Sequence, residues 1–494
     1  MGLPEPAPAQ FFERRAAYPW FVVGTVCIGA FVGQVDASIV QLGMPRFEDA
    51  FDAPLDAVSW VAVAYVLAFA AVLPAFARLA EIGGRKTLYL CGFALFGLFS
   101  ALSALAPSLP LLIGFRALQG ISGAMLGANS VVILVAAAGS ARRGKALGIM
   151  AAAQAVGLSL GPTLGGVLLA TAGWRSIFWV TVPFALVGAA LGWLIVPKTS
   201  TFAKERRFDL AGAALLIPAL VALLTAIAQW RAWGPSAALV ACAVGGPVLL
   251  ALFVWRESRA PAPLIDLRLF RSAAFSAGCV GVLVSYAMLY AMFFAMSFAL
   301  IRGYHDPTFA AGLRLTVVPA ALGLVAPFGG AWADKRPRLI MAGGMAICLA
   351  SALALTALLT GTPESLNGVM AALAAFGAGL GLYIAPNNSA AVGAAPAEKS
   401  GVAGGLLNLL RVFGAGVGVA AASTALGWGL HAEANAGART ARVGEAALLS
   451  AVGGVLAMLA VLAVVAGAAA FVRSKQAAGD PEPSPLGAPL RHGA

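Results

Sequence analysis

The sequence contains little charge. Asp, Glu, Lys and Arg account for 11% of its 494 residues, whereas 61% are hydrophobic. A soluble domain carries about 25% charged residues. So low a charge content excludes an ordinary water-soluble protein and directs attention to the long uncharged runs between the charges.

Cysteine and histidine are also scarce. The five cysteines lie in apolar runs and lack the C-x-x-C spacing of metal or redox sites: Cys27, Cys91, Cys242, Cys279 and Cys348. They are interpreted as small buried hydrophobic residues. The three histidines fall in predicted loops or near the C-terminus. No disulfide, metal site or cofactor is therefore expected.

The apolar runs number fourteen, and each approaches the ~20 residues that a helix needs to cross a bilayer. They cover about 19–42, 57–79, 86–106, 109–136, 145–171, 174–197, 209–230, 235–255, 273–301, 309–332, 338–360, 367–393, 400–428 and 445–472. Transmembrane β-strands would be about ten residues long and alternate in polarity, unlike these runs. The pattern predicts an all-α polytopic membrane protein.

The positive charges lie mostly on one side of this topology. With the N-terminus in the cytoplasm, most Lys and Arg residues fall in cytoplasmic loops and tails, as the positive-inside rule requires. Both termini are therefore expected in the cytoplasm. These loops explain the net charge of +12, so nucleic acid is not expected as a partner. The polar, Pro- and Gly-rich residues 473–494 are predicted to be disordered.

Acidic residues avoid the spans, and only Asp36 lies deep within one. A charged group there costs about 2.5–3.5 kcal/mol on insertion scales, so it is by default a candidate functional residue. A rise of about 1.5 Å per residue places Asp36 in the outer half of the membrane. Gln34, Ser38 and Gln41 lie on nearly the opposite face of the same helix. Asp36 is predicted to bind a proton or a cationic substrate, and a fixed packing partner is the alternative.

Two cytoplasmic loops share a pattern, which indicates an internal repeat. FARLAEIGGRKTL follows the second span and GGAWADKRPRLI follows the tenth. Parallel repeats are typical of transporters, which bind substrate between the halves near the midplane. The predicted organisation is a tail (1–18), a six-helix bundle (19–200), two linker helices (201–258), a second six-helix bundle (259–472) and a tail (473–494). The alignment pairs Ala77 with Gly330, Glu81 with Asp334, and Arg85 with Arg338.

Four segments share sequence patterns with one known family. FARLAEIGGRKTL is similar to the motif G-x-L-A-D-R-x-G-R-[KR], with Ala77 and Glu81 as departures. VDASIVQLGMP, LLIGFRALQGISGA and GLSLGPTLGG are similar to its first, fourth and fifth spans. In these segments the sequence resembles the major facilitator superfamily, specifically its fourteen-span drug:proton antiporter branch. The resemblance covers about residues 19–472 and implies the major facilitator fold, with two six-helix bundles and two extra helices.

The resemblance also assigns roles to residues. It implies proton coupling or gating by Asp36, Arg116 and Arg411. It identifies an antiporter motif in Gly157, Gly161, Pro162, Gly165 and Gly166, although close packing of small residues would also explain these glycines. The residues expected to gate the cytoplasmic rim are Ala77, Glu81, Gly84, Arg85, Gly330, Asp334 and Arg338, with Arg142 and Arg143 as partners for Glu81.

Polar and aromatic side chains within the spans are candidates for lining a substrate cavity. They are Gln34, Ser38, Gln41, Gln119, Tyr286, Tyr290, Phe293, Asn387, Asn388 and Asn408. Aromatic residues suit an apolar pocket, and a packing or lipid-facing stripe is an equal alternative. The sequence APNN at Pro386 predicts a local helix break. A direct pair between Asp36 and Arg116 is a further hypothesis.

The expected function is export of hydrophobic or amphipathic small molecules in exchange for protons, in the inner membrane of a bacterium. A dedicated metabolite or lipid exporter without proton coupling is the alternative of the same fold. A membrane enzyme or receptor is the alternative of another class, and the absence of HExxH, GxSxG and P-loop motifs argues against an enzyme. The expected partners are lipid, a small-molecule substrate and protons, and the chain is expected to be monomeric.

Overall fold

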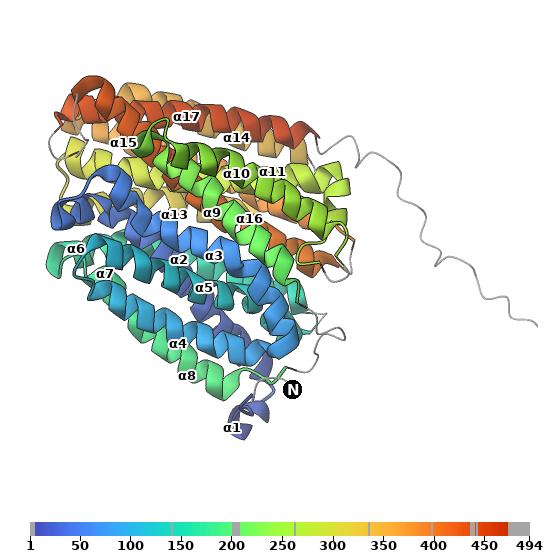
Figure 1. Ribbon diagram of the computed structural model, residues 1–494. Coiled ribbons are helices and arrows are strands. Elements are labelled where there is room, and N and C mark those ends of the chain that lie inside the picture. The colour runs from blue at the N-terminus through green and yellow to red at the C-terminus, as the bar shows by residue number, and fades with distance from the viewer. Residues whose placement is uncertain are drawn as a thin grey trace, which may run out of the picture.

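The molecule is a bundle of long helices that run roughly parallel or antiparallel to one another (Figure 1). The computed structural model describes residues 5–139, 142–199, 208–260, 263–333, 336–396, 399–434, 440 and 443–472. Within these residues, fourteen helical segments are long and apolar enough to cross a membrane. The predicted all-α fold and its number of spans are confirmed.

The helices pack as two groups and one pair. The first group contains α2 (Tyr18–Phe51), α3 (Leu55–Gly83), α4 (Arg85–Ala104), α5 (Leu109–Ala138), α6 (Arg143–Thr171), α7 (Ser176–Trp179) and α8 (Thr181–Ile195). The second contains α11 (Ala273–Phe298), η3 (Ala299–Gly303), α12 (Thr308–Leu315), α13 (Val317–Ala333), α14 (Pro337–Leu358), α15 (Leu366–Gly393), α16 (Ser400–Ala434) and α17 (Glu445–Val472). The pair is α9 (Leu210–Trp233) and α10 (Ala237–Glu257), and the short elements are α1 (Gln10–Glu13), η2 (Leu267–Arg271) and η4 (Pro363–Ser365).

The two ends of the bundle are distinguished by their charges. The basic face is defined here as the end where α2 begins and α3 ends, and it carries Arg78, Arg85 and Arg143. It lies on the right in Figure 1. The opposite face is the end where α2 ends and α3 begins. Tail residues 473–494, predicted to be disordered, lie outside the described residues.

Polar caps and one glycine set the ends of several helices. Asp209, Ser236 and Ser272 each accept a hydrogen bond from a backbone N–H in the first turn of α9, α10 and α11, which satisfies a donor that the helix leaves unpaired. Gly84 separates α3 from α4 at a φ of 116°. A Cβ at that position would also lie 2.5 Å from Glu5 Oε1. Glycine is therefore required at this junction.

Two local predictions differ from the structure. The first span was expected over 19–42, but α2 continues to Phe51 because its charged last turns find partners across the bundle rather than lipid. The helix break predicted at APNN is wrong, since α15 continues through Pro386 to Gly393. Its neighbour Asn387 donates from Nδ2 to the carbonyl oxygen of Gly278 at 3.1 Å, and this contact anchors the helix there.

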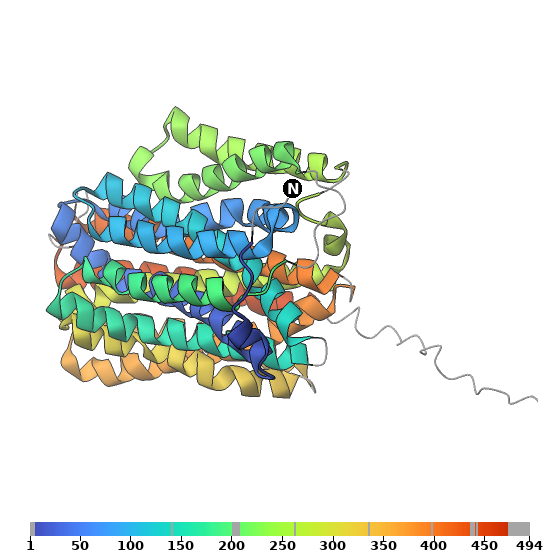
Figure 2. The same ribbon diagram turned by 90° about the horizontal axis from the view of Figure 1, so that it is seen from below.

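The pair α9 and α10 lies along one side of the bundle (Figure 2). α9 packs against α3 of the first group and α16 of the second, whereas α10 packs mainly on α9. Arg231 of α9 forms a buried ion pair with Asp56 of α3. Thr424 of α16 donates to the carbonyl oxygen of Ile227 at 2.8 Å. α9 therefore joins the two groups on that side.

Candidate substrate cavity and buried charge cluster

Asp36, Arg116 and Gln119 form a closed cluster inside the first group. Arg116 Nη1 donates to Asp36 Oδ2 at 2.8 Å and to Asp36 Oδ1 at 3.1 Å. It also donates to Gln119 Oε1 at 2.6 Å, and Gln119 Nε2 donates to Asp36 Oδ1 at 3.0 Å. The side chains of Asp36 and Arg116 are 0% and 1% exposed. The direct pair that the sequence left as a hypothesis is present in the structure.

Helix α3 completes the surroundings of Arg116. Arg116 Nε donates to the carbonyl oxygen of Val61 at 3.1 Å, and the guanidinium carbon lies 4.3 Å from the centre of the Tyr65 ring. Gly120 permits this approach, because a Cβ there would overlap the backbone of Tyr65. With both charges buried, removing one partner would leave an uncompensated charge, a change that typically costs about 3–5 kcal/mol.

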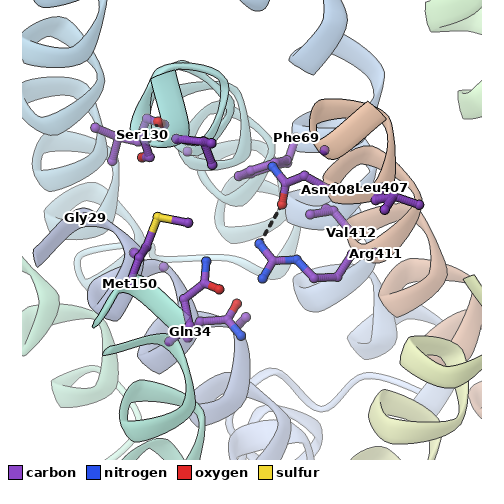
Figure 3. A pocket seen from close by; sticks show the side chains of 18 of the residues that line it. Gly29, Gln34, Phe69, Ser130, Met150, Leu407, Asn408, Arg411 and Val412 are labelled. Carbon is purple, nitrogen blue, oxygen red and sulfur yellow. Dashed lines mark hydrogen bonds between the residues drawn. The ribbon is translucent and has the colours of Figure 1, made fainter. Parts of the chain in front are cut away.

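A cavity of about 420 Å³ lies between the two groups (Figure 3). Its size is in the range of sites for drug-sized ligands. Arg143 and Ser400, the first residues of α6 and α16, stand at its mouth, so it opens at the basic face. Its described wall includes Gly29, Ala30, Gly33, Gln34, Ala37, Tyr65, Phe69, Ser130, Met150, Gln154, Tyr286, Tyr290, Asn388, Asn408 and Arg411.

Arg411 extends from α16 into this cavity, towards the wall that carries Gln34 and Met150 (Figure 3). Its Nη2 donates to Asn408 Oδ1 at 2.6 Å, and its guanidinium carbon lies 5.9 Å from the centre of the Tyr286 ring. The side chain is only partly buried. Arg411 therefore keeps donors directed at the cavity.

The residues predicted to line a cavity divide into two sets. Gln34, Tyr286, Tyr290, Asn388 and Asn408 line it. The described wall does not include Gln119, which belongs to the charge cluster, or the buried residues Ser38, Gln41, Phe293 and Asn387. The cavity face of α2 is thus the face of Gln34, whereas Asp36 faces α5 and Ser38 faces Gly161 of α6.

The glycines of the antiporter motif bring α6 against α2. A Cβ at Gly157 would lie 2.6 Å from the carbonyl oxygen of Phe31, and one at Gly165 would lie 2.8 Å from Ile39 Cγ1. A Cβ at Gly161 would likewise overlap the side chain of Ser38. Gly166 instead faces α12 in the second group. α6 remains one helix through Pro162, so Gly157, Gly161 and Gly165 serve close packing within the first group, whereas Gly166 serves a contact between the groups.

The expected partners of Glu81 at the basic face are wrong. Glu81 pairs with Arg78 at 2.7 Å and with Arg85 at 3.6 Å, within its own helix and the following turn. Arg143 donates to Ser400 Oγ at 3.1 Å, and Arg142 is exposed. The remaining residues of this predicted gate lie as follows: Ala77 is half-buried in α3, Gly330 lies in α13, Arg338 is exposed in the first turn of α14, and Asp334 lies outside the described residues.

The sequence did not predict the contacts that join the groups at the opposite face. Arg302 donates to Asp49 Oδ1 at 2.5 Å and to the carbonyl oxygen of Pro45 at 3.2 Å. Its guanidinium lies 3.9 Å from Glu48, which also accepts hydrogen bonds from the backbone and hydroxyl of Thr440. These charges stand at span ends, where the sequence cannot pair residues of different halves. They close the end of the bundle away from the cavity mouth.

Several further wall residues were also not predicted, among them Tyr65, Phe69, Met150 and Gln154. Only Gln154 carried a usable signal, as the one amide in its predicted span. In the part of the chain that is described, no three His, Cys, Asp or Glu side chains gather as a metal site would require.

Comparisons with known proteins agree with this fold. The family described as "Major Facilitator Superfamily" matches residues 26–419. The multidrug resistance protein Stp of Mycobacterium tuberculosis is 32% identical over 81% of this chain and 74% of its own length. The riboflavin transporter RibZ of Clostridioides difficile is 28% identical over 81% of this chain and 87% of its own length.

A solved structure supports the fold at lower identity. It is a bacterial homolog of the human lysosomal transporter Spinster, with a TM-score of 0.67 at 15% identity over 93% of this chain and 98% of that one. The predicted family and the prediction that the chain is no enzyme are confirmed by these relatives. The chain belongs to the Major Facilitator Superfamily and is a multi-pass membrane transporter.

Proposed function

We propose that this transporter exports hydrophobic or amphipathic small molecules in exchange for protons. Asp36 is the carboxylate that binds the proton, and the residues 19–200 and 259–472 move against each other around the cavity. The protein acts as a monomer in the inner membrane of a bacterium, with both termini in the cytoplasm. It uses no cofactor, since the proton gradient supplies the energy.

The observation that carries the proposal is the buried cluster of Asp36, Arg116 and Gln119. While Asp36 is ionised, its charge and that of Arg116 cancel. Protonation of Asp36 removes this balance and leaves Arg116 as an unpaired cation in a buried site, which is unfavourable. The cluster therefore has two charge states of different energy, as a coupled conformational equilibrium requires.

The position of the cavity supports the direction of transport. The basic face carries the excess of Lys and Arg, which the positive-inside rule assigns to the cytoplasm. A cavity open at this face and closed at the other by Asp49, Glu48 and Arg302 suits loading from the cytoplasm. Release on the far side requires these contacts to break and the mouth at Arg143 and Ser400 to close.

A dedicated metabolite exporter is a second candidate function. The relative named as a riboflavin transporter supports it. A screen of small molecules separates the two candidates, because a dedicated transporter moves one chemical class whereas a multidrug exporter moves several.

Inverted membrane vesicles test the proposal. Candidate substrates are added to vesicles with an imposed pH gradient, and its collapse is measured for the wild type and for Asp36→Asn. We expect substrate-dependent collapse with the wild type and none with Asp36→Asn. Asp56→Asn is the matched control, because it neutralises a buried, ion-paired carboxylate outside the cluster. Wild-type rates of collapse with Asp36→Asn would refute the role of Asp36.

A further inference from the structure

The charge in the cavity wall is of one sign. Arg143 stands at the mouth and Arg411 lies deeper. Among the described residues that line the cavity, none is Asp, Glu, Lys or His. The remaining polar groups of the wall are amides and hydroxyls. The wall is therefore cationic.

Arg411 has no acidic partner to offset its charge. Among the described residues, Arg411 makes no ion pair with a carboxylate, and its Nη2 donates to the amide oxygen of Asn408 at 2.6 Å. An arginine has five N–H donors and no acceptor. A partly buried cation that keeps donors directed at a cavity is suited to bind an anionic group.

Asp36 does not compensate this charge. Its oxygens are occupied by Arg116 and Gln119, and it does not line the cavity. Tyr65 forms the wall at this level, with its ring against Arg116 on the other side. A bound ligand thus meets the tyrosine ring and not the carboxylate, so a cationic ligand finds no counter-ion there.

The rest of the wall is apolar or aromatic. Phe69, Tyr286 and Tyr290 offer rings, and Met150 is a polarizable side chain that adapts to different shapes. We propose that the cavity selects amphipathic anions, with a carboxylate, phenolate or sulfonate on an aromatic or aliphatic body, and that Arg411 binds the anionic group. Arg143 provides a second cationic site at the entrance. This specificity rests on the proposed export function and names its class of substrate.

A set of three probes with one ring system tests the proposal. Naphthalene-2-carboxylate, its uncharged carboxamide and naphthalen-2-ylmethylammonium are compared by equilibrium dialysis against the full-length protein in detergent near neutral pH. We expect the carboxylate to bind roughly tenfold more tightly than the carboxamide, because a charge-assisted hydrogen bond replaces a neutral one. The ammonium probe should bind most weakly.

Variants assign the preference to Arg411. Arg411→Gln should lower the affinity for the carboxylate to that for the carboxamide, while the carboxamide is bound as before. Arg411→Lys should keep the order of the three probes, because it retains the charge. Arg259→Gln is the control, since Arg259 is exposed in the loop after α10 and stacks on Trp255. Retained binding of the carboxamide shows that Arg411→Gln is folded.

Equal affinities for the three probes, tightest binding of the ammonium probe, or no binding of any of them would overturn the proposal. So would an unchanged carboxylate preference in Arg411→Gln. The binding assay needs no proton gradient, so it is independent of coupling. Anion preference without collapse of a pH gradient would refute the proposed antiport and leave the proposed specificity intact.

Discussion

Arg116 and Arg411 both lie in membrane-spanning helices of this transporter, and their surroundings differ. Arg116 is fully buried and paired with Asp36, so the first group of helices holds a neutral cluster. Arg411, in the second group, is partly exposed to the cavity and, within the described part of the chain, donates a hydrogen bond to the amide of Asn408. The same side chain therefore pairs with a buried acid in one group and, among the described residues, lacks an acidic partner in the other. The two groups have different electrostatic roles.

The largest expected effect is that of Arg116→Ala on stability. It leaves Asp36 buried without a counter-ion, and we expect a loss of about 3–5 kcal/mol in the free energy of unfolding. Chemical unfolding of the protein in detergent measures this loss. The double variant Asp36→Asn/Arg116→Gln should recover most of it, since no uncompensated charge remains. A stability of Arg116→Ala equal to that of the wild type would contradict the buried pair.

A third arginine, Arg302, lies at the boundary between the two groups of helices, where it pairs with Asp49. Its pair with Asp49 is partly exposed, so Arg302→Gln should weaken closure of the opposite face by only about 0.2–1 kcal/mol. In a background without native cysteines, a water-soluble maleimide should label Gln41→Cys about 1.4-fold to fivefold faster when Arg302 is replaced, as this range implies. The charge-reversed double variant Asp49→Arg/Arg302→Asp should restore slow labelling. Unchanged labelling in Arg302→Gln would exclude a gate at this pair.

Arg411→Ala should have little effect on stability. Because no carboxylate loses its partner, we expect a change within about 0.5 kcal/mol, as for residues outside a buried network. The unfolding assay used for Arg116→Ala measures both variants under the same conditions. An equal loss of stability in the two variants would mean that the two arginines do not differ as described.

A further small effect is expected at a partly exposed ion pair near the basic face. Lys399 Nζ lies 2.5 Å from Asp266 Oδ2, and this hydrogen bond holds the pKa of Asp266 below its usual value of 3.8. The pair therefore contributes stability above that value, and the contribution is lost as the pH falls through the lowered pKa. The contribution should be less than about 1 kcal/mol because the pair is partly exposed to solvent. In Lys399→Gln, the melting temperature should fall less steeply as the pH is lowered through the acid range. An unchanged slope would refute the contribution of this pair.

The fold was largely predictable, whereas the arrangement of the site was only partly so. Hydropathy identifies the residues that are favourable in lipid, so it located the spans. It ended the first span before the charged residues Glu48 and Asp49, which belong to α2. Asp36 was recognisable because a lone acid in an apolar run is costly. Its partner Arg116 was recognisable for the same reason.

The predictions that failed were those of contacts between residues that lie far apart in the chain. Helical periodicity gives the two faces of α2 but not which face meets the cavity and which meets α5. The same limit hid the pairing of Asp49 with Arg302 and led to the wrong partners for Glu81, whose contacts are local. Pro386 was misread because Asn387 anchors α15 to α11, a tertiary contact that no local pattern reveals.

The position of α9 has a consequence for how a lipid-soluble compound enters. α9 covers the seam between α3 and α16, fastened by Asp56–Arg231 on one side and by Thr424 on the other. Gly416 of α16, Leu224 of α9 and Val66 of α3 meet beneath it. Along this side, a solute dissolved in the bilayer meets a continuous wall of protein. Entry from the lipid between α3 and α16 is thus blocked by α9.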